Sequence, residues 1–191
     1  MEKLEKTAAA LRRRGFEAVV FETAKEAADY LLSDMPAGET VGFGGCMTAK
    51  KMGLETLLRA AGHKVLWHWE AEPAERPALL HEAMNAPLYV CSANAVTEDG
   101  LMVQIDGTGN RVASMLYGHE ALYIVAGVNK LAPDLASAMD RARSIAGPLN
   151  ARRLQRKTPC ALAEPMRCHD CNSPERICRG FVTLARPMGG I

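Results

Sequence analysis

Four cysteines near the C-terminus carry the sharpest chemical signal in the sequence. Spacers of seven, two and six residues separate them in the order Cys160, Cys168, Cys171 and Cys178. Thiolates this close in sequence can converge on one metal ion or one cluster. Structural zinc commonly uses two CxxC pairs, whereas this segment has one pair with longer flanking spacers. The spacing therefore favours a 4Fe-4S cluster in a loop over residues 158–180. Zinc is the alternative. A third possibility is that the four cysteines are free thiols that bind no metal.

A glycine-rich turn is the second candidate. The sequence VGFGGCMT predicts a strand that runs into Gly44 and Gly45 and then into a helix that begins near Thr48. Glycines let a backbone approach a ligand closely, and a helix N-terminus offers free N–H groups to an anion. The turn suits a phosphate or a carboxylate. The alternative is a tight turn in which Thr48 only caps the helix.

Two polar turns follow apolar segments in the middle of the chain, and each combines carboxylates with amides. Because ligands of open α/β sheets lie beyond the carboxyl ends of the strands, we expect both turns to line one crevice. Glu98, Asp99 and Asp106 are the candidate acids, bases or nucleophiles. Ordinary turn chemistry of Asp-Gly and Gly-Asn pairs is the alternative. The candidate ligand-binding residues of these turns are Asn94, Thr108, Asn110 and Arg111.

A third predicted strand ends before Asn129 and Lys130, and Lys130 could neutralise an anionic ligand. A solvated surface lysine is the alternative. The basic segment from Arg141 to Lys157 contains no Asp or Glu. It lacks interleaved aromatic residues, so a solvated helix face or an anion contact near the cysteines fits it better than an RNA patch. His169, inside the cysteine loop, is expected to be a neighbour of the metal rather than a ligand.

Composition narrows the class of protein. The chain has 191 residues, of which 48% are apolar, and a net charge of +1, so neither a nucleic-acid partner nor a membrane surface is expected. No apolar stretch has the length of a signal peptide or of a membrane span. We therefore expect a cytoplasmic protein, where clustered cysteines favour a metal over disulfides.

Apolar periodicity predicts alternating helices and strands, and hence an α/β sandwich with a mainly parallel sheet. The segment 121–128 is apolar throughout, as in a strand that is buried on both faces. The predicted helices cover residues 2–14, 24–35, 48–61, 77–85, 111–117 and 134–146. The predicted strands cover 16–21, 40–44, 64–69, 87–93, 101–106, 121–128 and 181–185.

The run NAVTEDGLMVQIDGTGNRVASMLYG, with GFGGCMT before it and GVNK after it, resembles the LUD-domain family of the LutC/YkgG lactate-utilisation type. PLNARRL, TPC and the CxxCxSPxRIC motif are also similar to its short members, and the resemblance spans about residues 10 to 185. It implies a single domain over 1–191 with a Rossmann-like α/β sandwich of the NagB/RpiA/CoA-transferase type. It also implies work beside iron–sulfur partner proteins in oxidising L-lactate to pyruvate.

Three functions are compatible with these features. The first is an oxidoreductase component with a site for a small anionic organic acid or phosphate and an iron–sulfur centre. The second is a non-redox isomerase or CoA-transferase-like enzyme with a structural metal. The third is a ligand-binding regulatory or scaffold subunit, and a homo-oligomer is compatible with all three. We expect the cysteine loop to lie at the same sheet edge as Glu98 and Asp106, with the basic segment between them.

Overall fold

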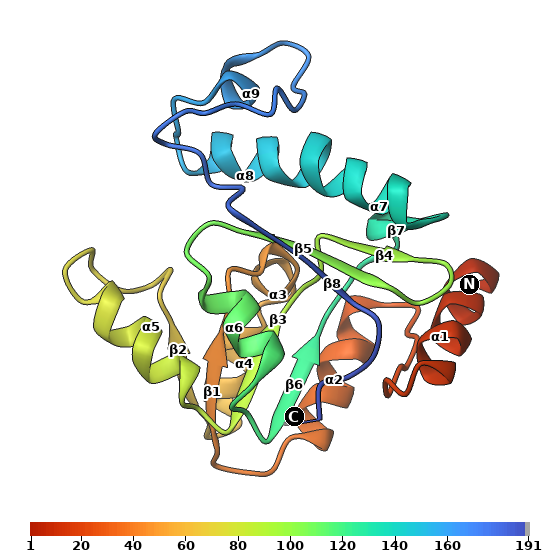
Figure 1. Cartoon of the computed structure of the whole chain (residues 1–191). Coiled ribbons are helices and arrows are strands. Elements are labelled where there is room, and N and C mark those ends of the chain that lie inside the picture. The colour runs from red at the N-terminus through yellow and green to blue at the C-terminus, as the bar shows by residue number, and fades with distance from the viewer. Residues whose placement is uncertain (190–191) are drawn as a thin grey trace.

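The computed structural model describes residues 1–189 and contains two four-stranded sheets (Figure 1). The first sheet is entirely parallel, because each of its strands is joined to the next by a helical connection. Its carboxyl ends all meet at one edge. In spatial order its strands are β2 (Lys64–Trp67), β1 (Thr40–Phe43), β3 (Leu88–Cys91) and β6 (Ala121–Ile124).

Helices cover both faces of this sheet. One face packs against α2 (Ala24–Asp34), α3 (Met47–Met52) and α4 (Leu54–Ala60), and their Leu31 and Leu58 are buried against Phe43. The other face packs against α5 (Arg76–Met84) and α6 (Asn110–Leu116). Residues of β1 and β3 are almost completely buried, as expected for central parallel strands.

The second sheet is mixed. β4 (Ala95–Thr97) and β5 (Met102–Asp106) form an antiparallel hairpin, β7 (Leu131–Ala132) pairs in parallel with β4, and β8 (Gly180–Leu184) runs antiparallel to β5. Alternate residues of the hairpin face two different cores. Val96 and Met102 pack in the core beside the first sheet, whereas Ala95 and Val103 pack against α7 (Leu135–Arg141).

One long helical rod connects the second sheet to the cysteine loop. It begins with α7, widens into a π-helical turn over Ala142–Ala146, and continues as α8 (Gly147–Arg153). In Figure 1 this rod lies on the side of the molecule toward which β1 and β6 point, with the cysteine loop beyond it. The remaining elements are α1 (Glu2–Arg13), the 3-10 turn η1 (Val128–Lys130) and α9 (Pro159–Leu162).

The α/β architecture predicted from the sequence is confirmed, and so are most of its elements. The capping box at the start of α2 is present, because Thr23 accepts from the Glu26 N–H while the Glu26 side chain accepts from the Thr23 N–H. The helix predicted over 48–61 is divided in two by Gly53, which has a φ of 62°. No helix within residues 1–189 is both long and apolar enough to cross a membrane.

The strands differ from the prediction at three points. Residues 16–21 form no strand; Phe16 packs against the core beside the first sheet, and Phe21 packs against the Tyr30 ring. β6 is only half-buried, since it is an edge strand of the first sheet rather than a strand covered on both faces. The short strand β4 was not predicted, and the hairpin that it forms with β5 makes the second sheet mixed, although four of the six strand pairings are parallel as expected.

Candidate functional site

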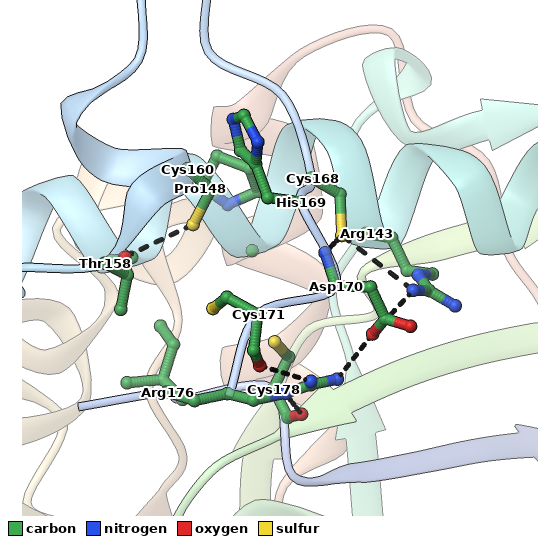
Figure 2. Close-up of a pocket in the computed structure, with 13 residues that line it drawn as sticks. Arg143, Pro148, Thr158, Cys160, Cys168, His169, Asp170, Cys171, Arg176 and Cys178 are labelled. Atoms are coloured by element: carbon green, nitrogen blue, oxygen red, sulfur yellow. Dashed lines mark hydrogen bonds and ion pairs between the residues drawn. The ribbon is translucent and has the colours of Figure 1, made fainter. Parts of the chain in front are cut away.

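The four C-terminal cysteines line one pocket. Cys160 comes from α9, Cys168 and Cys171 from the loop that follows, and Cys178 from the residues just before β8. Figure 2 shows the four sulfur atoms facing a common space, with Pro148 of α8 behind it. The cavity volume of this pocket is only about 20 Å³, although about 350 Å³ lies between the surrounding atoms when open solvent is counted. Residues far apart along the loop are thus brought together on one site.

Arginine side chains hold the cysteine loop in place. Arg176 donates to the carbonyl oxygens of Cys171 at 2.6 Å and Cys178 at 2.9 Å, and to the Asp170 carboxylate at 3.0 Å. Arg152 of α8 donates to the carbonyls of Ala161 and Ala163 at 3.0 and 3.1 Å. Because the loop has little regular structure, these bonds replace the backbone ladder that a helix or strand would supply.

Hydrogen-bond donors surround the sulfur atom of Cys168. The Asp170 backbone N–H donates to Cys168 Sγ at 3.4 Å, and Arg143 Nη2 lies 3.9 Å from the same sulfur (Figure 2). Arg143 also forms an ion pair with the Asp170 carboxylate at 2.9 Å. The hydrogen bond from Arg176 and the charge of Arg143 lower the pKa of Asp170. The carboxylate is therefore already engaged by two arginines, which leaves the cysteines as the donor set of the pocket.

Within residues 1–189, no three His, Cys, Asp or Glu side chains are arranged so that they could hold one metal ion. The four sulfurs share a pocket but do not form a tight single-ion cage. His169 lines the same pocket. The ligand roles predicted for the four cysteines therefore remain predictions.

A second group of polar residues lies at the carboxyl ends of the parallel strands. We call it the strand-end site. The turn after β1 contributes glycines, the residues after β3 contribute a hydroxyl and an amide, and the segment after β6 contributes a lysine. Helix α6 and the rod add two arginines. Its members are Gly44, Gly45, Thr48, Ser92, Asn94, Arg111, Lys130 and Arg141.

The glycine turn is tightly enclosed. A Cβ atom at Gly44 would lie 3.2 Å from Arg111 Cγ, Cys91 Cβ and the Tyr89 hydroxyl oxygen. The Gly45 carbonyl accepts from Arg111 Nη1 at 3.3 Å. The helix cap predicted at Thr48 is instead Cys46, whose Sγ accepts from the Ala49 N–H at 3.2 Å. The Thr48 hydroxyl is thereby left to accept from Lys130.

Three cations of the strand-end site have no carboxylate partner within 4 Å among residues 1–189. Arg111 donates to the Ile105 carbonyl at 2.6 Å and to Asn94 Oδ1 at 3.3 Å, and its buried Nε has no partner. Arg141 donates to the backbone carbonyls of Asn94 and Asn129. Burial, together with the charges of Arg141 and Arg111, lowers the pKa of Lys130 to about 8. An anion would complete this group.

An aromatic rim flanks the glycine turn. Trp69 lies against Gly45, since a Cβ there would meet Trp69 Cζ2 at 3.2 Å. The Arg153 guanidinium of α8 lies 4.4 Å from the Trp69 ring centroid, and Lys50 Nζ lies 5.9 Å from it. Cation–π contact thus keeps two further positive charges beside the turn.

Glu98 and Asp99 lie away from the strand-end site. They occupy the tip of the β4–β5 hairpin, whereas Asn94 and Asp106 lie at its open end. Glu98 forms an ion pair with Lys3 of α1 at 2.9 Å, and Asp99 pairs with Arg14 at 2.7 Å. The prediction that both polar turns line one crevice is wrong, because the strands between them are antiparallel.

The Asp106 turn joins the strand-end site to the cysteine loop. The Asp106 carboxylate accepts from the N–H groups of Gly107 at 2.7 Å and Val112 at 3.1 Å, so it organises the start of α6. Its carbonyl accepts from the Arg179 N–H at 2.9 Å, and a Cβ at Gly107 would meet the Ile177 carbonyl oxygen at 2.5 Å. The predicted proximity of the cysteine loop to Asp106 is confirmed, whereas Glu98 is at the other end of the hairpin.

The other predicted ligand-binding residues lie around this edge. Thr108 is exposed in the turn, and its N–H donates to Asp106 Oδ1 at 3.3 Å. Asn110 begins α6. Asn129 exposes its side chain and contributes its carbonyl to Arg141. Sequence reasoning missed Ser92, which is only 4% exposed and follows β3 directly. Its position at a strand end was the available signal.

Comparisons with known proteins give one match. The family model of the LUD domain matches residues 4–190. No curated protein and no solved structure matches the chain. The match covers nearly the whole chain, including the strand-end site and all four cysteines of the pocket. The chain therefore belongs to the LUD-domain family.

Proposed function

We propose that the protein is a component of the oxidation of a small 2-hydroxy acid, such as L-lactate, and that it holds a 4Fe-4S cluster on Cys160, Cys168, Cys171 and Cys178. The observation that carries the proposal is the convergence of these four cysteines on one pocket. Membership of the LUD-domain family supports a link to lactate utilisation. The NagB/RpiA/CoA-transferase type of fold is part of the same proposal.

The donor set fits a cluster better than one ion. A single tetrahedral zinc needs four sulfurs within about 2.3 Å of its centre. No such tight group occurs among residues 1–189. A cubane is wider than an ion, so its ligand sulfurs stand farther apart around a shared space, and the four cysteines line one such space (Figure 2). Zinc remains the alternative that metal analysis would distinguish.

The protein contributes charge and hydrogen bonds to this pocket. When bound, a cluster would supply one-electron exchange. The Asp170 N–H and Arg143 face the Cys168 sulfur, and such donors stabilise the more negative, reduced state of a thiolate-bound cluster. Arg176 fixes the backbone on which Cys171 and Cys178 lie. These residues would raise the reduction potential and keep the four sulfurs in place.

The strand-end site would bind the acid. Arg111, Arg141 and Lys130 place three positive charges beside the glycine turn without a carboxylate to balance them. A small carboxylate or phosphate matches this charge, and the close approach at Gly44 limits its size. The proposal includes iron–sulfur partner proteins as electron acceptors, and a cytoplasmic location.

A second candidate function is a non-redox enzyme in which the cysteines hold a structural metal. The observation that favours it is the strand-end site itself, which is complete without any contribution from a cysteine of the pocket. In this reading Glu98 is not the nucleophile, because it is paired with Lys3 at the far end of the hairpin.

Anaerobic purification tests the proposal. A brown protein with iron and acid-labile sulfide in equal amounts, about four of each per chain, is the expected result. Cys168→Ser and Cys171→Ser should each lose the metal, and Cys46→Ser, a buried cysteine outside the pocket, should keep it. A colourless protein with one zinc per chain would overturn the redox proposal and favour the second candidate.

A further inference from the structure

Lys130 occupies an unusual position for a lysine. It ends η1, and its Nζ reaches back over the ends of the parallel strands. There it donates to the Thr48 hydroxyl at 3.2 Å and to the Ser92 hydroxyl. Ser92 in turn donates to the Val125 carbonyl at 2.5 Å. Two hydroxyls from two different strand ends therefore fix one amine in place.

No carboxylate balances this amine among residues 1–189. The charged and titratable groups that face it are the guanidinium groups of Arg111 and Arg141 and the thiols of Cys46 and Cys91. Burial raises the pKa of the Cys91 thiol to about 12, so this thiol offers no negative charge near neutral pH. A lysine that served only to stabilise the fold would ordinarily be paired with an acid.

The hydrogen bonds leave the nitrogen lone pair free. A neutral amine has two N–H groups and one lone pair, and both N–H groups have acceptors in Thr48 and Ser92. The lone pair must then point away from these two oxygens. Burial and neighbouring cations lower the pKa of Lys130 to about 8, so roughly a tenth of the molecules carry the neutral amine at pH 7. Lys130 as a residue is only partly buried.

We propose that Lys130 Nζ forms an imine with the carbonyl carbon of a small 2-oxo acid whose carboxylate lies against Arg141 and Arg111. This inference rests on the acid site of the proposed function and adds a covalent step to it. The amine lone pair attacks the carbonyl carbon, and the carbonyl π electrons move to its oxygen. Protons move from the nitrogen to that oxygen, water leaves, and a C=N bond remains.

The two hydroxyls have different roles. Thr48 contacts the nitrogen that loses a proton, and its hydroxyl can accept one proton while it donates another. Ser92 gives its own proton to the Val125 carbonyl, so it orients the amine. No oxidant or reductant is consumed in this step. The ligand class follows from the site: one carboxylate for the cations, one adjacent carbonyl for the amine, and little bulk because of Gly44 and its neighbours.

Reductive trapping tests the proposal. The purified, metal-loaded protein is incubated anaerobically with pyruvate and cyanoborohydride, and its peptides are analysed by mass spectrometry. The expected product is a mass increase of ~72 Da on Lys130, which is pyruvate less water plus two hydrogens. Trapping should accelerate as the pH rises through 8, because the neutral amine is the nucleophile. L-Lactate, which has a hydroxyl in place of the ketone carbonyl, should give no adduct.

Two variants serve as controls. Lys130→Arg keeps the positive charge but cannot form an imine, so it should still be stabilised thermally by pyruvate and give no adduct. Lys51→Arg, on the exposed side of α3, should react as the wild type does. Ser92→Ala should slow trapping about tenfold while thermal stabilisation by pyruvate persists.

The outcomes separate this inference from the proposed function. Stabilisation by pyruvate without an adduct on Lys130, or adducts spread equally over surface lysines, would overturn the imine and leave the acid site standing. Failure of pyruvate and L-lactate alike to stabilise the protein would overturn the acid site and the imine together. Neither result alters the iron and sulfide content, which tests the cysteine pocket separately.

Discussion

The cysteine pocket and the strand-end site are built in opposite ways. The strand-end site lies where parallel strands end, and sheet pairing fixes Gly44, Ser92 and Lys130 relative to one another. The cysteine pocket lies in a loop without regular structure over most of residues 163–179. Arg143, Arg152 and Arg176 hold that loop mainly through side-chain bonds to its carbonyls and to Asp170. The core strands position the strand-end site, whereas arginine side chains of the rod and the loop position the cysteine pocket.

This contrast predicts that the conformation of the two sites depends to different degrees on a bound ligand or metal. A site on core strands keeps its conformation without a ligand, because opening it would require unfolding of the core, which costs nearly the full free energy of unfolding. A loop with few buried apolar contacts opens at a much lower cost, and a bound group stabilises only the closed form. We therefore expect the cysteine pocket, but not the strand-end site, to depend on its metal.

Removal of the metal should give the largest effect. Chelation should raise the rate of proteolysis within residues 163–179 by roughly 1,000-fold, since a ligand at about 1,000 times its Kd stabilises the bound form by about 4 kcal/mol. Cleavage and amide exchange near Ser92 should stay unchanged. Limited proteolysis and hydrogen exchange of both forms measure this. Equal protection of the loop in the two forms would contradict the contrast.

Lys130→Met should change how stability depends on pH. The pKa of Lys130 is lowered from 10.5 to about 8, so between these values the unfolded chain binds one more proton than the folded one. The free energy of unfolding of the wild type should therefore rise from pH 8 to pH 10.5, by about 3 kcal/mol. Below pH 8 Lys130 is protonated in both states, so the full cost of burying its charge lowers the free energy of unfolding.

In Lys130→Met this rise should be missing, and the variant should be the more stable protein at pH 7. Urea unfolding at several pH values checks the prediction. Lys51→Met, on the exposed side of α3, is the matched control and should follow the wild type. A parallel pH profile for wild type and Lys130→Met would show that the amine titrates normally.

Arg176→Lys should weaken metal retention. The guanidinium bonds to Cys171, Cys178 and Asp170 cannot all be made by one ammonium group. Because the group is partly solvated, we expect a loss of about 1–2 kcal/mol, or roughly tenfold in metal affinity. Iron retained per chain during chelator titration measures it. Arg179→Lys, whose side chain donates to the Arg176 and Pro174 carbonyls rather than to those of the cysteines, should retain iron nearly as the wild type does.

Glu98→Gln and Asp99→Asn should have the smallest effects. Their ion pairs with Lys3 and Arg14 are exposed, and such pairs contribute less than about 1 kcal/mol. Neither variant should alter thermal stabilisation by pyruvate or L-lactate. A loss of acid binding in Glu98→Gln would place the hairpin tip in the site after all.

Features that depend on local sequence were predicted well. The cysteine spacing, the glycine turn and the α2 capping box each lie within a few residues, and the structure places them in one pocket, at one sheet edge and at one helix start. Their physical causes are short-range: loop closure around a common space, backbone approach and side-chain capping. Lys130 and Arg111 lie at strand ends for a similar reason, because both follow predicted strands; their ligand-binding roles stay predictions.

Features that depend on pairing over distance were predicted less well. The error for Glu98 and Asp99 came from strand direction: a strand of only three residues, Ala95–Thr97, reverses the chain, and so short a segment gives no periodic signal. Arg141 looked like a solvated helix residue, because nothing in its neighbourhood in the sequence shows that Asn94 lies against it. Tertiary contact decides such positions.

The rod formed by α7, the π-helical turn and α8 has a consequence for insertions and deletions. It carries Arg141 at the strand-end site, Arg143 at the cysteine pocket, and Arg153 over Trp69. Each residue added or removed turns a helix by about 100° and moves it by about 1.5 Å. A deletion between Ala142 and Ala146 would therefore shift Arg153 relative to Arg141, so that both could not keep their partners. The length of this segment should be invariant even where the identity of its exposed residues is free to change.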